Sequence, residues 1–218
     1  MPTIFVIAGP NGIGKTTSSY DLVSRNIPLI NSDEIAKEAR IAGMLSVNTQ
    51  EYSNQEAARL VDEQLNQRKS FAIETNLADI ETWKFILKVQ ELGYELHIKY
   101  ISTDKLGLLN SRIEQRVLLG EHFVRPDIVE QRYISSLKLL NHYFDKADIL
   151  ELFDNSKTLS LMAEVRKGQV IVIADLLPDW ISSYLGEHLK PPNNQESGVR
   201  NLSNLDAVRK KYEELKKK

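Results

Sequence analysis

A glycine-rich pattern near the amino terminus constrains the fold of this chain more than any other feature. Residues Gly9–Thr16 read GPNGIGKT and match G-x-x-x-x-G-K-[ST] in full. The preceding run, Thr3–Ala8, is apolar and rich in β-branched residues, which predicts a strand buried on both faces. The sequence from Lys15 to Arg25 favours a helix. Strand, glycine turn and helix in this order form the context in which the pattern binds phosphate.

The chemistry of the pattern predicts a nucleotide site. Glycines let the backbone N–H groups turn inward toward phosphate oxygens, and the following helix adds its positive amino-terminal end. We expect Lys15 to reach the β- and γ-phosphates of ATP, and the Thr16 hydroxyl to bind the Mg²⁺ that accompanies ATP. The alternative is a glycine-rich turn without a ligand. The predicted ATP-binding residues are Gly9, Pro10, Asn11, Gly12, Ile13, Gly14, Lys15, Thr16 and Thr17.

The rest of the chain alternates strand-like and helix-like segments. Strands are predicted at residues 28–31, 70–74, 94–102, 149–153, 158–165 and 169–174. Helices are predicted at residues 32–42, capped by Ser32, and at 50–69, 79–91, 104–119 and 126–147. This alternation predicts an α/β fold of the P-loop NTPase class, with a nucleotide-kinase-like parallel sheet flanked by helices. The last two strands, joined at Lys167–Gly168, are expected to form an antiparallel edge.

Composition narrows the class of protein further. The 28 basic and 30 acidic residues give a formal charge of -2, which argues against a surface built mainly for nucleic acid or membranes. Cysteine is absent, which excludes a disulfide scaffold, a thiolate metal site and a cysteine nucleophile. No apolar run is long enough for a membrane span, and the first residues make a poor signal peptide. We therefore expect a cytoplasmic protein.

A change of composition near Lys190 suggests two regions. Residues 1–190 are predicted to form a P-loop kinase domain with a helical lid at about 104–135. Residues 191–218 begin with linker composition and continue, from Leu202, as a charged helical tail. Seven basic and four acidic residues give this segment a charge of +3. The tail is either a solvated helix or a docking helix for a partner protein.

Two other classes of P-loop protein are disfavoured. Asp104–Gly107 fits the D-x-x-G pattern of GTPases, but Asp145–Asp148 has aspartate where a guanine-reading asparagine belongs. A transporter-type ATPase needs a Ser-Gly-Gly signature that the sequence lacks. A small-molecule kinase needs an acidic substrate side and a lid with arginines, and both are visible here.

Two acidic residues fall at the predicted carboxyl edge of the sheet. Asp33 begins the helix after the second strand, where a carboxylate can accept the proton of an attacking hydroxyl. It is equally suited to stabilise the helix amino terminus. Glu74 ends a buried strand, where its charge would meet a metal, a cation, a substrate or simply solvent. Thr75 and Asn76 are hydrogen-bonding neighbours, either for substrate or for the turn.

Arginines cluster in the predicted lid. Arg112, Arg116, Arg125 and Arg132 fall within 21 residues, in a stretch without lysine between residues 106 and 137. One arginine guanidinium can bind two phosphate oxygens at once. The alternative is that these arginines form surface ion pairs with the glutamates that lie between them in the sequence. Phosphate contact is favoured for Arg116 and Arg132 over the other two. His122 follows the glycine break and would orient the lid or the substrate, or be structural only.

Several strings together resemble one family over residues 1–175. Gly9–Thr17, Asn31–Ala36 (NSDEIA), Ala72–Leu77 (AIETNL) and Arg116–His122 with Arg132–Tyr133 are similar to the small zeta-toxin-like P-loop kinases. The resemblance implies an enzyme that uses ATP and Mg²⁺ to phosphorylate the 3′-hydroxyl of UDP-N-acetylglucosamine. It also implies an antitoxin partner that blocks the ATP site.

Roles for individual residues follow from this resemblance. It implies Lys15 and Thr16 at phosphate and Mg²⁺, Asp33 as general base and Glu74 near the acceptor. It also implies Arg116 and Arg132 at the transition-state charge. Thr75, Asn76, His122 and Arg125 complete the expected substrate side. The chain departs from the family pattern at Gly120–Arg125 and at Asn76, which lie on the expected acceptor side. The alternative function is an ATP-binding regulatory module or ATPase of a toxin–antitoxin pair, without small-molecule kinase activity.

Overall fold

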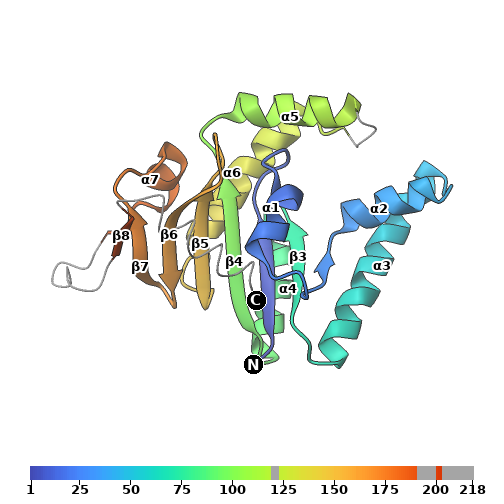
Figure 1. Ribbon diagram of the computed structural model, residues 1–218, viewed down its shortest axis with the longest axis horizontal. Helices are drawn as coiled ribbons and strands as arrows, with labels where there is room; N and C mark the ends of the chain where they lie inside the picture. The colour runs from blue at the N-terminus through green and yellow to red at the C-terminus, as the bar shows by residue number, and fades with distance from the viewer. Residues whose placement is uncertain (119–122, 191–199, 203–218) are drawn as a thin grey trace.

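An eight-stranded sheet forms the centre of the molecule (Figure 1). The computed structural model describes residues 1–118, 123–190 and 200–202. The strands are β1 (Thr3–Ala8), β2 (Leu29–Ile30), β3 (Phe71–Thr75), β4 (Glu95–Ser102), β5 (Ile149–Asp154), β6 (Ser160–Arg166), β7 (Gln169–Ala174) and β8 (Arg200–Leu202). The helices are α1 (Lys15–Leu22), α2 (Ser32–Ile41), α3 (Ser46–Asn66), α4 (Ile80–Glu91), α5 (Leu106–Leu118), α6 (Pro126–His142) and α7 (Asp179–Leu185).

The strand order is β2-β3-β1-β4-β5-β6-β7-β8. The first five of these strands pair in parallel, with Val6 of β1 beside both Ile73 of β3 and Ile98 of β4. Strands β6 and β7 turn the sheet antiparallel, and β8 adds a parallel edge to β7. The predicted fold class, including the antiparallel strands late in the chain, is confirmed.

The helices cover both faces of the sheet. The chain steps from β1 past β3 to β2, and later steps the opposite way from β3 past β1 to β4. Because parallel crossovers are right-handed, these opposite steps place α1 on one face and α4 with α6 on the other (Figure 1). On the second face, Trp83 of α4 is fully buried. Tyr100 of β4 is also fully buried, and its hydroxyl lies 2.6 Å from that of Ser136 in α6. The central strands are thus fixed from both sides.

Several predicted boundaries were wrong for local reasons. Asn31, rather than Ser32, caps α2, because its side chain accepts a hydrogen bond from the backbone of Asp33. Helix α6 ends at His142, five residues early, since the chain then turns to bury Phe144 and Ala147. Helix α7 and strand β8 were not predicted. Leu202 ends β8 instead of beginning a helix, and the rest of the predicted tail lies outside the described residues.

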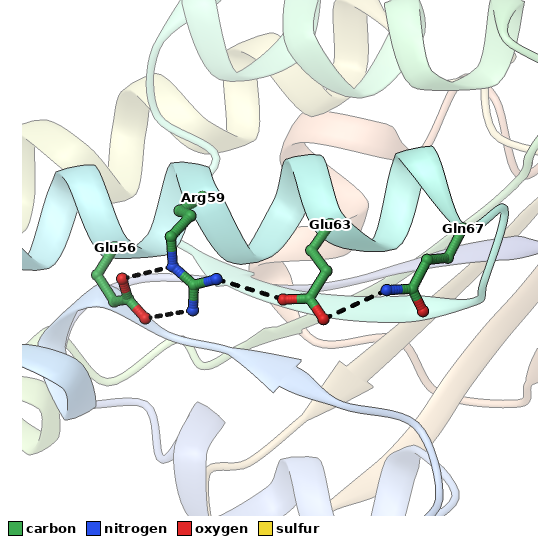
Figure 2. Close-up of polar contacts among 4 residues, drawn as sticks. All are labelled: Glu56, Arg59, Glu63 and Gln67. Atoms are coloured by element: carbon green, nitrogen blue, oxygen red, sulfur yellow. Dashed lines mark hydrogen bonds and ion pairs between the residues drawn. The ribbon is translucent and has the colours of Figure 1, made fainter.

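Helices α2 and α3 form a hairpin at the β2 edge of the sheet (Figure 1). The outer side of α3 carries a chain of polar contacts one turn apart (Figure 2). Arg59 pairs with Glu56 and Glu63, and Gln67 donates to Glu63. Such exposed pairs at i,i+3 and i,i+4 support a helix modestly. Among the described helices, none has the length and apolar character that a membrane span requires.

Candidate active site

The glycine-rich pattern Gly9–Thr16, called the phosphate loop from here on, connects β1 to α1. It lies at the carboxyl edge of the parallel strands, as the pattern predicts. The loop runs between packed backbones, and two glycines make that possible. A Cβ at Gly12 would lie 2.6 Å from the carbonyl oxygen of Leu109, and one at Gly9 would collide with that of Ile101. Both glycines also have positive φ angles, 140° at Gly9 and 78° at Gly12. Any larger residue at these positions would displace the loop.

Lys15 is buried at the start of α1, and its ammonium group points back into the loop. Its Nζ donates to the carbonyl oxygens of Gly9 at 2.9 Å and Pro10 at 3.1 Å. A third bond reaches Oδ1 of Asn76 at 3.1 Å. Burial lowers the pKa of Lys15, while the nearby carboxylates of Glu74 and Asp33 act in the opposite direction. The Lys15 side chain is thus held by neutral oxygen acceptors, which phosphate oxygens could replace.

Glu74 lies against Thr16, at the carboxyl end of β3. The Thr16 hydroxyl donates to Oε2 of Glu74 at 2.9 Å, and Nδ2 of Asn31 donates to the same oxygen at 2.9 Å. Burial raises the pKa of Glu74, an effect that the charge of Lys15 and the Thr16 hydrogen bond oppose. A hydroxyl beside a carboxylate is an all-oxygen donor set of the kind that Mg²⁺ prefers. The residues present therefore fit a nucleotide-associated Mg²⁺.

Asp33 lies in the first turn of α2, with its side chain exposed. The capping bond of this helix comes from the Asn31 side chain, so the Asp33 carboxylate is not needed as the cap. Its charge acts on both Lys15 and Glu74. The structure therefore brings the predicted base close to the phosphate loop.

The two residues that follow Glu74 differ in what they contact. Thr75 accepts a hydrogen bond from the backbone of Leu77 at 3.0 Å and so organises the turn after β3. Leu77 has a φ angle of 56° and a fully buried side chain. Asn76 instead contacts Lys15. Asn76 is therefore hydrogen-bonded to the phosphate loop, whereas Thr75 is hydrogen-bonded within the turn after β3.

The four lid arginines have different surroundings. Arg132 of α6 donates to Oδ1 of Asn11 at 3.1 Å, which brings it to the phosphate loop. The charge of Arg116, on α5, acts on Lys15. Arg125 forms an exposed ion pair with Asp127 at the start of α6. His122 lies outside the described residues.

Arg112 and Asn155 both contact the phosphate loop at the carbonyl oxygen of Ile13, an arrangement that the sequence does not predict. Nη1 of Arg112 lies 3.3 Å from the carbonyl oxygen of Ile13, and Nδ2 of Asn155 donates to the same oxygen at 2.8 Å. Nη2 of Arg112 also reaches the carbonyl oxygen of Asn155 at 3.4 Å. Asn155 directly follows β5, so its position at the carboxyl edge of the sheet was the available signal. Asn31, which bonds Glu74, could have been found in the same way.

Two adjoining cavities open on this edge. The smaller, about 700 Å³, is lined by the phosphate loop and the first residues of α1, with Thr17, Glu74 and Asn155 on its walls. The larger, about 940 Å³, lies between α2 and the start of α3 on one side and α5 with α6 on the other. Arg125 lines the larger cavity and not the smaller. Six residues line both: Asn11, Gly12, Asp33, Glu34, Asn76 and Arg116.

Comparisons with known proteins agree with this geometry. Residues 1–175 match the family model described as zeta toxin. An uncharacterised protein of Haemophilus influenzae is 29% identical over 126 residues, which are 57% of this chain and 88% of that protein.

Solved structures share the fold at low sequence identity, and two of them serve as examples. The AvrRxo1-ORF1:-ORF2 structure with ATP is 15% identical, with a TM-score of 0.65 over 100% of this chain and 76% of that one. The PezAT toxin–antitoxin system of Streptococcus pneumoniae is 16% identical, with a TM-score of 0.51 over 73% of this chain and 70% of that one.

Proposed function

Because the chain belongs to the zeta toxin family, whose model matches residues 1–175, we propose that it is a kinase that uses ATP and Mg²⁺ to phosphorylate a hydroxyl group of a small molecule. Family membership and the P-loop fold support the coarser statement, a nucleotide-dependent phosphotransferase. The observation that carries the proposal is the junction of the two cavities. Asp33, Asn76 and Arg116 line both, so a phosphate donor and an acceptor can meet beside them.

ATP would occupy the smaller cavity. The loop N–H groups and the amino-terminal end of α1 would hold its phosphates, and Lys15 would exchange its carbonyl partners for phosphate oxygens. Mg²⁺, when bound with ATP, neutralises charge on the phosphates. Thr16 would be its ligand, and Glu74 would orient that hydroxyl. Glu74 therefore fits the metal side of the site better than contact with the acceptor, the role that the resemblance implied.

The acceptor would occupy the larger cavity, with its hydroxyl toward Asp33. The carboxylate of Asp33 would take the hydroxyl proton as the oxygen attacks the terminal phosphorus. Asp33 suits this task because it is exposed, lines both cavities and leaves the capping of α2 to Asn31. The bond from the terminal phosphorus to the bridging oxygen of ATP breaks, and ADP leaves.

Two arginines would stabilise the charge that spreads over the transferring group. Arg132 is joined to the loop through Asn11, and Arg116 lines both cavities. Guanidinium groups placed at the point of developing charge act with little reorganisation. Asn76 would help to align Lys15, and Arg125 and His122 would contribute to the acceptor side.

The acceptor is proposed to be a sugar nucleotide such as UDP-N-acetylglucosamine. The family assignment supports this choice, and a cleft of about 940 Å³ is large enough for a ligand of that size. The solved structures that share the fold include a two-protein complex and a toxin–antitoxin system. We propose that this chain likewise binds an antitoxin-type partner and that residues 203–218, with six basic and three acidic residues, contribute to binding. Truncation after Leu202 tests this without removing β8.

The decisive experiment incubates the protein with ATP, Mg²⁺ and a panel of hydroxyl-bearing metabolites that includes UDP-N-acetylglucosamine. Mass spectrometry then identifies any product heavier by one phosphoryl group. We expect Lys15→Ala to abolish transfer, and Asp33→Asn to slow it by about 10²- to 10⁴-fold with ATP binding intact. Transfer that survives both changes would refute the mechanism. ATP binding without transfer to any acceptor would favour a regulatory module.

A further inference from the structure

Three charged side chains in the middle of the sheet are buried on the side of α1. Lys99 precedes Tyr100, which faces α6, so Lys99 points to the opposite face, where α1 lies (Figure 1). Glu151 is its cross-strand neighbour on β5, and Glu164 is the neighbour of Glu151 on β6. Each of the three is less than a tenth exposed. Charged side chains on a bare sheet face are open to water, so burial this deep requires a layer above them.

The helices that the structure describes do not supply this layer. α4 and α6 pack on the opposite face, as does α7, whose Trp180 ring lies 5.8 Å from the ring of Tyr100. α1 packs on β1, whereas the charged row runs from β4 to β6, away from β1 (Figure 1). Residues 191–199 connect α7 to β8 and are fixed at both ends, while residues 203–218 follow β8. The segment 203–218 is therefore the candidate for the missing layer.

This segment is long enough to reach the whole row. Neighbouring strands lie about 4.8 Å apart, so Glu164 is about 10 Å and Lys99 about 19 Å from β8 across the sheet. The 16 residues of the segment would span about 24 Å as a helix. A helix that begins where β8 ends, after Leu202, could therefore cross β7, β6 and β5 and finish over β4.

Residues 203–218 have the pattern of a helix with one apolar side. Apolar side chains recur at intervals of three and four residues: Leu205, Val208, Tyr212 and Leu215. At about 100° per residue, Arg209 and Lys216 would fall about 60–80° from the middle of this stripe. Lys210 and Lys217 would fall on the opposite side. A helix that lays its apolar side on the sheet would therefore bring Arg209 and Lys216 toward the sheet.

The sheet face has the opposite balance of charge. On strands β4–β7 its charged side chains are three carboxylates and two cations: Glu95, Glu151, Glu164, Lys99 and Arg166. Lys99 pairs with Glu151, and Arg166 pairs with Glu164 from the edge, with 55% of the arginine side chain exposed. His97 also faces this side, but burial lowers its pKa, so it carries no charge at neutral pH. Because Glu151 and Glu164 are cross-strand neighbours of like charge, cations placed over them would be stabilising.

We infer that residues 203–218 dock on the α1 face of the sheet of the same chain, as an amphipathic helix that covers the row from Glu164 to Lys99. Its apolar side would rest on Val172 and Ile149, which are half-buried beside the row. Arg209 and Lys216 would lie toward the buried carboxylates. The opposite side of the helix would stay available to the partner proposed above.

Thiol labelling tests the docking directly, because the chain has no cysteine of its own. Val172→Cys places a single thiol on the face. Its rate of reaction with a maleimide is measured in the protein of residues 1–218 and after truncation behind Leu202, which keeps β8. We expect truncation to raise this rate by about tenfold or more, because the layer over the thiol is gone. Equal rates in the two proteins would overturn the inference.

The matched control is Leu87→Cys, at a half-buried position of α4 on the opposite face. The labelling rate of this thiol should not change on truncation, which also establishes that the truncated protein is folded. An equal acceleration at both positions would show a general loosening of the domain and would overturn a local cover at Val172.

Charge reversal tests the orientation of the helix with the whole chain present. In the Val172→Cys protein, Arg209→Glu/Lys216→Glu places negative charge over the buried carboxylates. We expect labelling to accelerate by about tenfold, as after truncation. Lys210→Glu/Lys217→Glu makes the same change of net charge on the outward side and should leave the rate unchanged. Equal effects of the two double variants, or no effect of the first, would overturn the docked arrangement.

The dependence of the labelling rate on protein concentration identifies which chain supplies the layer. A segment of the same chain protects the Val172→Cys thiol equally in dilute and in concentrated protein. Protection that grows with concentration would assign the face to a second copy and would overturn the inference. These measurements need neither ATP nor an acceptor, so their outcome is independent of the proposed kinase reaction.

Discussion

Glu74 shows how one buried carboxylate can organise a phosphate site. It accepts hydrogen bonds from Thr16 and Asn31, and it faces the charge of Lys15. These contacts join β3, α1 and the turn before α2 at one point. The carboxylate nevertheless loses more hydration than these partners replace, since its pKa is raised. Glu74 thus holds the site together at a cost to the free energy of folding that depends on pH.

The raised pKa of Glu74 makes a testable prediction about stability. The unfolded chain releases this proton near its ordinary pKa of about 4.5, whereas the folded protein retains it to a higher pH. The group's contribution to stability is therefore present below the unfolded pKa and is lost as the pH rises through the folded pKa. Glu74→Gln has no proton to release. We expect the free energy of unfolding of this variant to increase relative to wild type from pH 4.5 upward.

The measurement is urea unfolding of both proteins, without nucleotide or Mg²⁺, at several pH values from 4.5 to 8. The test is how the difference in free energy of unfolding between the two proteins changes with pH. The size of that difference at any one pH is not the test, because Gln also alters the bonds to Thr16 and Asn31 by a constant amount. If the free energy of unfolding of wild type instead increased relative to that of the variant as the pH rises, the raised pKa of Glu74 would be contradicted.

At the residue scale, the sequence predicts positions better than contacts. Asp33 and Glu74 could be placed at one edge because parallel strands end together. The hydrogen bond between Thr16 and Glu74 could not be foreseen, because it depends on side-chain rotamers at the start of α1 and the end of β3, which are 58 residues apart in the sequence. The cap at Asn31 was missed because Ser32 offers an equally good capping chemistry. Local pattern does not decide between two adjacent capping residues.

At the element scale, the turn after β5 fixes the phosphate loop. Asn155 and Arg112 both bond the carbonyl oxygen of Ile13. If the N–H groups that follow Ile13 were to point toward phosphate, this carbonyl would point away from it, so anchoring the carbonyl would favour the binding-competent loop. Two elements distant in sequence, the turn after β5 and helix α5, therefore pre-organise the site from outside.

Removal of one of these contacts should weaken nucleotide binding without changing the chemistry. We expect Asn155→Ala to raise the Kd of a non-hydrolysable ATP analogue by about threefold to tenfold, the worth of one neutral hydrogen bond, with kcat nearly unchanged. Calorimetry gives the Kd. Asn141→Ala is the control, since Asn141 contacts His188 and lines neither cavity. A fall in kcat at constant Kd would assign Asn155 a different task.

Element boundaries were predictable where burial is continuous. The predicted and observed ends of β1 are the same, because a short run of apolar, β-branched residues is typical of a buried strand. Helix α7 has seven residues and β8 has three, too few for a period to be detected. Helix α3 begins at Ser46, four residues before the expected start, without a side-chain cap to mark it. Short or uncapped elements are defined by tertiary contacts that no local pattern contains.

At the scale of the whole molecule, an ion pair lies inside the sheet. Lys99 of β4 and Glu151 of β5 are cross-strand neighbours, each less than a tenth exposed, and they form a direct salt bridge. The pair lies at the seam between β4 and β5, which joins the phosphate-loop half of the sheet to its antiparallel half. Neither residue lines either cavity. Its role is therefore structural.

Loss of one partner should destabilise the entire domain. Lys99→Met leaves a buried carboxylate without its principal cation, and we expect the free energy of unfolding to fall by about 3–5 kcal/mol. The Lys99→Met/Glu151→Leu double variant removes both charges, so it should recover much of this loss. Urea unfolding measures both effects, and the Kd for the ATP analogue should stay constant in each folded variant. A single variant as stable as wild type would mean that other groups at the seam neutralise Glu151, and the two halves of the sheet would then depend on apolar packing alone.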